Sequence, residues 1–185
     1  MGPPSTWISA LLACIVPGAF VELLLEPRTA HAAGINLSWD ECGTAGSDLK
    51  TFACDTSAGE PFSLVASFVP PSGVQKYLGL SAEIKITGAT LPDWWMHGAG
   101  YCRGATGLSA SFDAPGGACV DYWQGRAVGG FLYQPSFGGA NSALLRVQAA
   151  LPFESAEALD PTREYYAFTA RMQRPKASEG CVGCE

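Results

Sequence analysis

The chain has 185 residues, of which 48% are hydrophobic and 15% are charged, and its formal net charge is −6. This much apolar material supports a packed core and argues against a chain that is disordered throughout. The 11 lysines and arginines are scattered, so the sequence offers no basic patch for a nucleic acid or an anionic membrane surface. The 22 glycines and 13 prolines favour short strands and turns over long helices.

The first 33 residues have the pattern of an export signal. The longest apolar stretch, Trp7 to Leu25, precedes Ala30-His31-Ala32, whose two alanines suit the pocket of a signal peptidase. We therefore predict a signal peptide at 1–33, a folded domain at 34–174 and a flexible tail, cut short, at 175–185. The protein is then exported to the periplasm, the cell surface or the medium.

Three alternatives to cleavage stay open, because no lysine or arginine precedes the apolar stretch. The stretch could be an uncleaved membrane anchor, although Pro17, Gly18 and Glu22 interrupt it. It could carry a lipid on Cys14, which follows Leu-Leu-Ala, or it could be a buried helix of the domain. A membrane is a predicted partner only through a leader that remains attached.

Cleavage near Ala32 would remove one of the seven cysteines and leave an even number, as a disulfide framework requires. The six that remain are Cys42, Cys54, Cys102, Cys119, Cys181 and Cys184. Because short loops close more readily than long ones, we predict the pairs Cys42–Cys54 and Cys102–Cys119. Cys181–Cys184 is a further candidate pair.

Zinc binding and redox chemistry are the alternatives for these cysteines. A zinc site would need a second Cys-x-x-Cys knuckle beside Cys181 and Cys184, and the sequence has only this one. A redox pair normally opens a helix that follows a strand, whereas this pair is followed only by Glu185. A structural or inert pair is therefore favoured, and no cofactor or metal is predicted.

Short segments with strand character, separated by glycine, proline and asparagine, run through the rest of the chain. The clearest alternation is at 77–87, where Leu80, Ala82 and Ile84 face one way and polar residues face the other. We predict strands at 35–39, 61–69, 77–87, 108–112, 127–134, 142–150 and 164–174. About seven to nine short strands without a helix predict an all-β fold, an antiparallel sandwich or jelly roll with disulfide-linked loops.

One local motif supports the sandwich. Leu159-Asp160-Pro161 leads into a predicted strand that carries Tyr165 near its start. This arrangement resembles the tyrosine corner of immunoglobulin-like and fibronectin-like sandwiches.

Adjacent tryptophans suggest a ligand site. Trp94 and Trp95 follow a predicted strand and cannot both face the core, so we expect at least one ring to be partly exposed. Aromatic faces stack on sugar rings and carboxylates accept their hydroxyls, so an extracellular glycan or cell-surface component is the predicted partner. The candidate binding residues are Asp93, Trp94, Trp95, Tyr101, Asp121, Tyr122 and Trp123. The alternative, which we favour, is that these rings cap one end of the sandwich and pack on a disulfide.

One cluster of acidic residues could supply the oxygens of a calcium site. Asp40, Glu41, Asp48 and Asp55 surround a predicted disulfide loop, but they lack the spacing of a calcium loop and are interpreted as a solvated acidic loop.

A hydrolase would have to use His97, the only histidine after residue 33, or two of the three carboxylates Asp93, Asp113 and Asp121. No Gly-x-Ser-x-Gly motif accompanies them.

Several segments resemble a group of exported bacterial β-rich proteins of unknown function. The matching segments are Asn36–Gly43, Phe68–Val74, Leu91–Trp95, Cys119–Gly125, Phe137–Asn141 and Glu164–Phe168. The resemblance implies export and a β-rich fold but supplies no catalytic residues. Proteins of this group continue beyond the Cys-x-x-Cys motif with another cysteine-bearing strand, which leaves the pairing of Cys181 and Cys184 open.

The sequence therefore favours an uncharacterised secreted or surface-associated module that binds a ligand or has a structural role, without catalytic residues. A secreted hydrolase that uses carboxylates near His97 is the alternative, and a thiol-redox protein is the third hypothesis.

Overall fold

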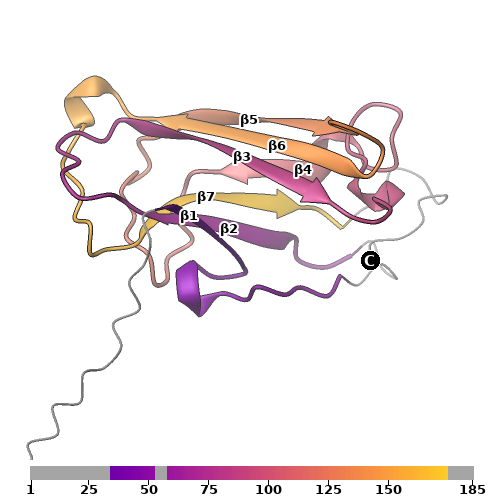
Figure 1. The fold of residues 1–185 in the computed structure, drawn as a ribbon, viewed down its shortest axis with the longest axis horizontal. Coiled ribbons are helices and arrows are strands. Elements are labelled where there is room, and N and C mark those ends of the chain that lie inside the picture. Colours follow the sequence, from indigo (N-terminus) through magenta and orange to yellow (C-terminus); the bar gives the residue numbers. More distant parts are fainter. Residues whose placement is uncertain (1–33, 53–57, 175–185) are drawn as a thin grey trace, which may run out of the picture. The chain divides into compact units, whose positions relative to one another are not determined.

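The strands form two antiparallel sheets stacked face to face (Figure 1). The computed structural model describes residues 34–52 and 58–174. In spatial order, the four-stranded sheet contains β1 (Gly34–Trp39), β2 (Phe62–Val69), β7 (Tyr165–Met172) and β4 (Leu108–Ser111). The three-stranded sheet contains β3 (Gly79–Thr87), β6 (Ser142–Ala150) and β5 (Val128–Pro135). The predicted all-β antiparallel sandwich is confirmed, and all seven predicted strands lie where the sequence places them, within two residues at their ends.

The only helices among the described residues are four single turns of 3₁₀ type in the connections between strands. They are η1 (Gly43–Ala45), η2 (Asp93–Trp95), η3 (Ala105–Gly107) and η4 (Phe153–Ser155). None of these helices has the length and apolar character that a membrane span requires.

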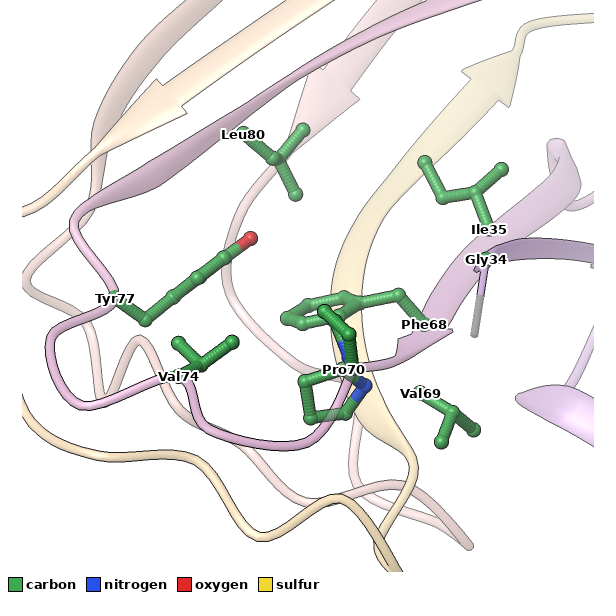
Figure 2. Close-up of a pocket in the computed structure, with 9 residues that line it drawn as sticks. Gly34, Ile35, Phe68, Val69, Pro70, Val74, Tyr77 and Leu80 are labelled. Carbon is green, nitrogen blue, oxygen red and sulfur yellow. The ribbon is translucent and has the colours of Figure 1, made fainter. Parts of the chain in front are cut away.

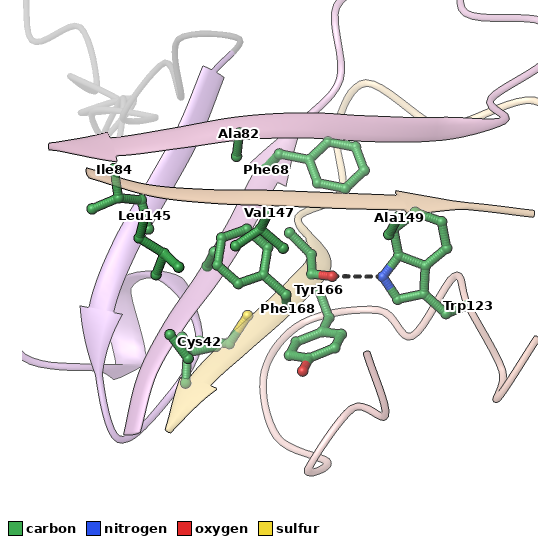
Figure 3. Close-up of a cluster of buried hydrophobic side chains, with 14 of the residues drawn as sticks. Cys42, Phe68, Ala82, Ile84, Trp123, Leu145, Val147, Ala149, Tyr166 and Phe168 are labelled. Carbon is green, nitrogen blue, oxygen red and sulfur yellow. Dashed lines mark hydrogen bonds between the residues drawn. The ribbon is translucent and has the colours of Figure 1, made fainter. Parts of the chain in front are cut away.

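The core fills the space between the two sheets. Figure 3 shows Leu145 and Val147 of β6 pointing toward Phe168 of β7, and all three are almost completely buried. The indole of Trp123 enters the same layer and donates a hydrogen bond of 2.8 Å to the carbonyl oxygen of Ala167. A large ring can be buried here because its one polar group is satisfied by the backbone of the opposite sheet.

The alternation predicted for β3 is also confirmed. Ala82 and Ile84 are buried, whereas Glu83 and Lys85 are exposed on the outer face. On that face Glu83 accepts a hydrogen bond of 2.7 Å from the guanidinium of Arg146, its cross-strand neighbour in β6. The outer face of β3 therefore carries polar side chains beside Arg146 and Gln148 of β6, and the core face of β3 carries apolar ones.

The turn before β7 forms a tyrosine corner, with Tyr165 as its tyrosine. The backbone N–H of Asp160 donates to the hydroxyl of Tyr165, the first residue of β7, over 3.0 Å. Leu159 of the same turn is buried in the core. The corner thus fixes the entry of the chain into β7, the strand that lies between β2 and β4.

The predicted pairing of neighbouring cysteines is wrong. Cys42 is bonded to Cys119, across 77 residues of sequence, so neither Cys42–Cys54 nor Cys102–Cys119 is formed. Cys102 is also disulfide-bonded. Cys14, Cys54, Cys181 and Cys184 lie outside the described residues, as do the predicted signal peptide at 1–33 and the predicted tail at 175–185.

The physical reason is that loop-closure entropy is a weak preference. Each doubling of loop length costs only about 0.6 kcal/mol, so folding energy readily overrides the advantage of a short loop. In the folded chain the connection after β1 meets the connection before β5, which places the α-carbons of Cys42 and Cys119 5.8 Å apart. Because disulfides persist in oxidising compartments, the bond indicates an environment outside the cytoplasm.

We expect the double substitution Cys42→Ala/Cys119→Ala to lower the free energy of unfolding by about 4 kcal/mol, because the bond closes a long loop in the unfolded chain. Denaturant unfolding of the natural chain and of the variant measures this loss. Peptide mapping of the non-reduced protein is the direct check, and recovery of a Cys42–Cys54 peptide would contradict the pairing.

Candidate functional site

The two adjacent tryptophans differ in burial. They lie in η2, just beyond the end of β3, where Trp94 is only 2% exposed and Trp95 is half-buried. Trp94 packs against Phe52 and Phe62, with ring centres 5.2 and 6.0 Å apart. One ring inside and one partly outside is the arrangement that the sequence predicts.

Tyr122 and Trp123 lie at the other end of the sandwich. The Tyr122 hydroxyl donates a hydrogen bond of 2.7 Å to the carbonyl of Tyr77, which precedes β3, whereas the two adjacent tryptophans of η2 follow the end of that strand. Tyr122 and Trp123 are both buried, and Asp121 accepts a 2.9 Å hydrogen bond from the N–H of Gln124 within a turn. The structure therefore does not gather the seven predicted binding residues into one aromatic surface.

The expected surface depended on a loop closed by Cys102 and Cys119, which is not formed. What remains at the η2 end is a smaller set: the exposed Asp93, the half-buried Trp95, and Tyr101, which is 47% exposed. These three residues come from one connection, 88–107, and provide two partly accessible rings and an exposed carboxylate.

The same connection carries a buried pair of basic side chains. His97 and Arg103 are bridged through their backbones, and both side chains are enclosed. The guanidinium of Arg103 lies over the Trp94 ring, 4.5 Å from its centre, a cation–π contact that partly compensates for lost hydration. Among the described residues, neither ring nitrogen of His97 and no guanidinium nitrogen of Arg103 has a hydrogen-bond partner.

Burial governs the protonation of these two groups. Burial, and then the positive charge of Arg103, lower the pKa of His97 to about 4, because a second buried cation is unfavourable. Burial also lowers the pKa of Arg103 to about 10. His97 is therefore a neutral imidazole at physiological pH, packed against the ring of Tyr133 at 5.3 Å.

The carboxylates of the hydrolase hypothesis are not brought to His97. Of the charged groups that the structure describes, Arg103 alone shifts the pKa of His97. Asp113 and Asp121 instead lie near the buried hydroxyl of Tyr166, whose pKa is raised to about 12, mainly by burial. Asp93 is exposed on η2. The imidazole and these carboxylates therefore do not share an accessible cleft among the described residues.

The acidic loop after β1 has structural contacts. Asp40 forms an ion pair with Lys50, and a carboxylate oxygen of Glu41 accepts a 2.9 Å hydrogen bond from the N–H of Cys42. Asp55 lies outside the described residues. Within 34–52 and 58–174, no three acidic, histidine or cysteine side chains come together as a metal site would require.

A pocket of about 230 Å³ opens between the edge strands β1 and β3, in a place that the sequence does not indicate (Figure 2). Its walls are apolar: Ile35 of β1, Phe68 and Val69 of β2, Leu80 of β3, and the connection from 70 to 77. Figure 2 shows Tyr77, Val74, Phe68 and Leu80 around a common space. Among residues 34–52 and 58–174, no charged side chain lines it.

One wall of the pocket is a stack of rings. The ring of Phe68 stacks on Tyr77 at 5.1 Å and on Tyr165 at 5.8 Å, with the planes tilted by 28° and 27°. Burial raises the pKa of Tyr77 well above its usual range, with a smaller contribution from Tyr122. The Tyr165 ring also belongs to the tyrosine corner, so this wall is fixed by the entry into β7.

Sequence reasoning missed both the pocket and the buried basic pair. The segment Pro70-Pro71-Ser72-Gly73-Val74 ends a predicted strand, and its apolar residues are the one available signal that this turn packs on something. Nothing in the local pattern around Arg103 indicates burial. Comparisons with protein-family models, with curated proteins and with solved structures found no match to this chain.

The lowered pKa of His97 makes stability depend on pH. In the unfolded chain His97 binds a proton below about pH 6.5, whereas in the folded chain it does so only below about pH 4. The free energy of unfolding therefore decreases as the pH falls from about 6.5 to about 4. We expect the loss attributable to His97 to reach about 3 kcal/mol. Denaturant midpoints measured from pH 7 to pH 4 should therefore fall less steeply for His97→Gln than for the natural chain. An NMR titration in which His97 protonates near pH 6.5 would contradict the burial.

Proposed function

We propose that this protein is an exported, non-enzymatic binding module whose ligand site is the apolar pocket between β1 and β3. The main support for this proposal is the lining of that pocket. It consists of apolar and aromatic side chains and backbone between the edge strands β1 and β3. An accessible hollow with such walls gains free energy when an apolar group displaces its water.

The dimensions favour one apolar group over a large ligand. The volume of about 230 Å³ is below the range of roughly 300–1,000 Å³ that is typical of sites enclosing a drug-sized molecule. The proposed ligand class is therefore an aliphatic chain end or a nonpolar side chain of a partner. Ile35, 45% exposed at the rim, and Pro71, also exposed, would make the first contacts.

Methyl NMR of the mature protein titrated with octan-1-ol tests this proposal. We expect saturable shift changes confined to the methyl groups of Ile35, Val69, Val74 and Leu80. Val74→Asp should abolish them, because a carboxylate in an apolar wall must be desolvated when the ligand binds. Leu49→Asp, at a site 84% exposed and away from the pocket, is the matched control and should bind normally. Shifts spread over the whole surface, or equal in both variants, would exclude the pocket as the site.

A glycan site is the second candidate, supported by Asp93, Trp95 and Tyr101. Their accessible rings and carboxylate lie in one connection, as stacking on a sugar would require.

For this candidate we expect the natural chain to bind at least one oligosaccharide on a glycan array, and Tyr101→Ala to lose about tenfold or more in affinity. Phe153→Ala, which removes another exposed ring, is the control and should leave binding unchanged. Silence of the natural chain on the array would eliminate the sugar ligand and leave the apolar pocket untouched.

A further inference from the structure

The buried pair His97 and Arg103 is held in place by the backbone around it. The carbonyl oxygen of Arg103 accepts a hydrogen bond of 2.8 Å from the N–H of Gly98. The single turn η3 follows, and the carbonyl oxygen of its last residue, Gly107, accepts a hydrogen bond of 2.8 Å from the N–H of Gln173, just beyond β7. The two side chains therefore project from a segment whose backbone is fixed at both ends.

The guanidinium of Arg103 has no group to receive its hydrogen bonds. Its side chain is fully enclosed, and within 34–52 and 58–174 no atom accepts a hydrogen bond from any of its three side-chain nitrogens. The Trp94 ring, 4.5 Å from the guanidinium carbon, carries no acceptor atom. Because buried donors are nearly always paired in folded proteins, the five N–H groups of this side chain call for an acceptor from outside the described chain.

The positive charge of Arg103 is also uncompensated. The ion pairs of the described chain use Lys50 and Arg146 instead. Burial alone lowers the pKa of Arg103 to about 10, so the described carboxylates lie too far away to act on it, and the group stays charged at neutral pH. Water accepts a hydrogen bond but does not neutralise a buried charge, whereas an anion does both.

The surroundings admit only a small anion. His97 is 5% exposed, and its ring centre lies 6.3 Å from that of Trp94 and 5.3 Å from that of Tyr133. A side chain at Gly107 would begin 3.1 Å from Nδ1 of His97, so the backbone at this glycine encloses the imidazole on a further side. Enclosure of this kind excludes water, which strengthens the attraction between a cation and an anion.

We propose that Arg103 and His97 bind a monovalent anion of the size of a chloride ion or a single carboxylate group. The planar fork of the guanidinium can donate two parallel hydrogen bonds to a carboxylate. The imidazole adds one N–H donor, and as a neutral group it brings no second charge. This site goes beyond the proposed binding of an apolar group, since neither residue lines the pocket between β1 and β3.

NMR detection of the Nε–H group of Arg103 in the natural chain, at neutral pH, tests this inference. Sodium chloride and sodium formate each replace sodium gluconate at constant ionic strength, because gluconate is too large for the site. We expect the Arg103 signal to shift saturably in chloride, in formate or in both, with half-saturation below about 100 mM. A response to formate alone identifies a carboxylate as the ligand, and a response to chloride alone identifies a halide.

A matched pair of variants localises the effect. The natural chain should melt at a higher temperature in the anion that binds than in gluconate, because the anion binds only the folded state. Arg103→Met removes the buried charge and should make the melting temperature insensitive to this exchange. Arg163→Met removes a charge from an exposed site and should respond as the natural chain does.

An Arg103 signal that responds to chloride and formate no more than to gluconate would overturn the inference. So would an equal thermal response of Arg103→Met and the natural chain, because the anion would then act elsewhere. If Arg103→Met does not fold, the Arg103 signal of the natural chain decides the question alone. Failure of the anion site leaves the pocket proposal standing, since octan-1-ol carries no charge.

Discussion

The bond between Cys42 and Cys119 is the constraint on which the rest of this fold depends. It fixes the middle of the connection, 112–127, that crosses from β4 to β5 and therefore from one sheet to the other. The same connection pairs Val120 with Tyr165 at the start of β7 and places Trp123 between the layers. The disulfide, the Val120–Tyr165 bridge and the buried Trp123 ring thus all hold this one connection in place. Together they close the end of the core at which β7 begins.

The strands were predictable because each carries its own local signal. Alternation in β3 and the apolar run of β2 report directly which faces are buried, and glycine and proline mark their ends. The tyrosine corner was predictable for the same reason, since Asp160 and Tyr165 are close in sequence. The sulfur pairing was not, because it depends on which connections meet in space, and no local pattern encodes that.

The candidate ligand sites were also only partly predictable from the sequence. The sequence correctly indicates that the rings of Trp94 and Trp95 cannot share one environment, but it cannot place Tyr122 at the far end of β3. The pocket likewise forms only where the segment 68–80 packs beside Gly34 and Ile35 of β1, which lie more than 30 residues earlier in the chain. Features that depend on one short segment could be predicted from the sequence, whereas features that depend on the packing of the two sheets could not.

The position of β7 has a consequence for the order in which the molecule can be completed. β7 is the last strand of the described chain, yet it lies between β2 and β4 and is buried along almost its whole length. Until Tyr165–Met172 has been synthesised, β2 lacks its inner neighbour and β4 has no neighbour in its sheet. The sandwich therefore cannot assemble progressively from its first residue, and a nascent or halted chain presents unpaired apolar strands to whatever chaperone accompanies it.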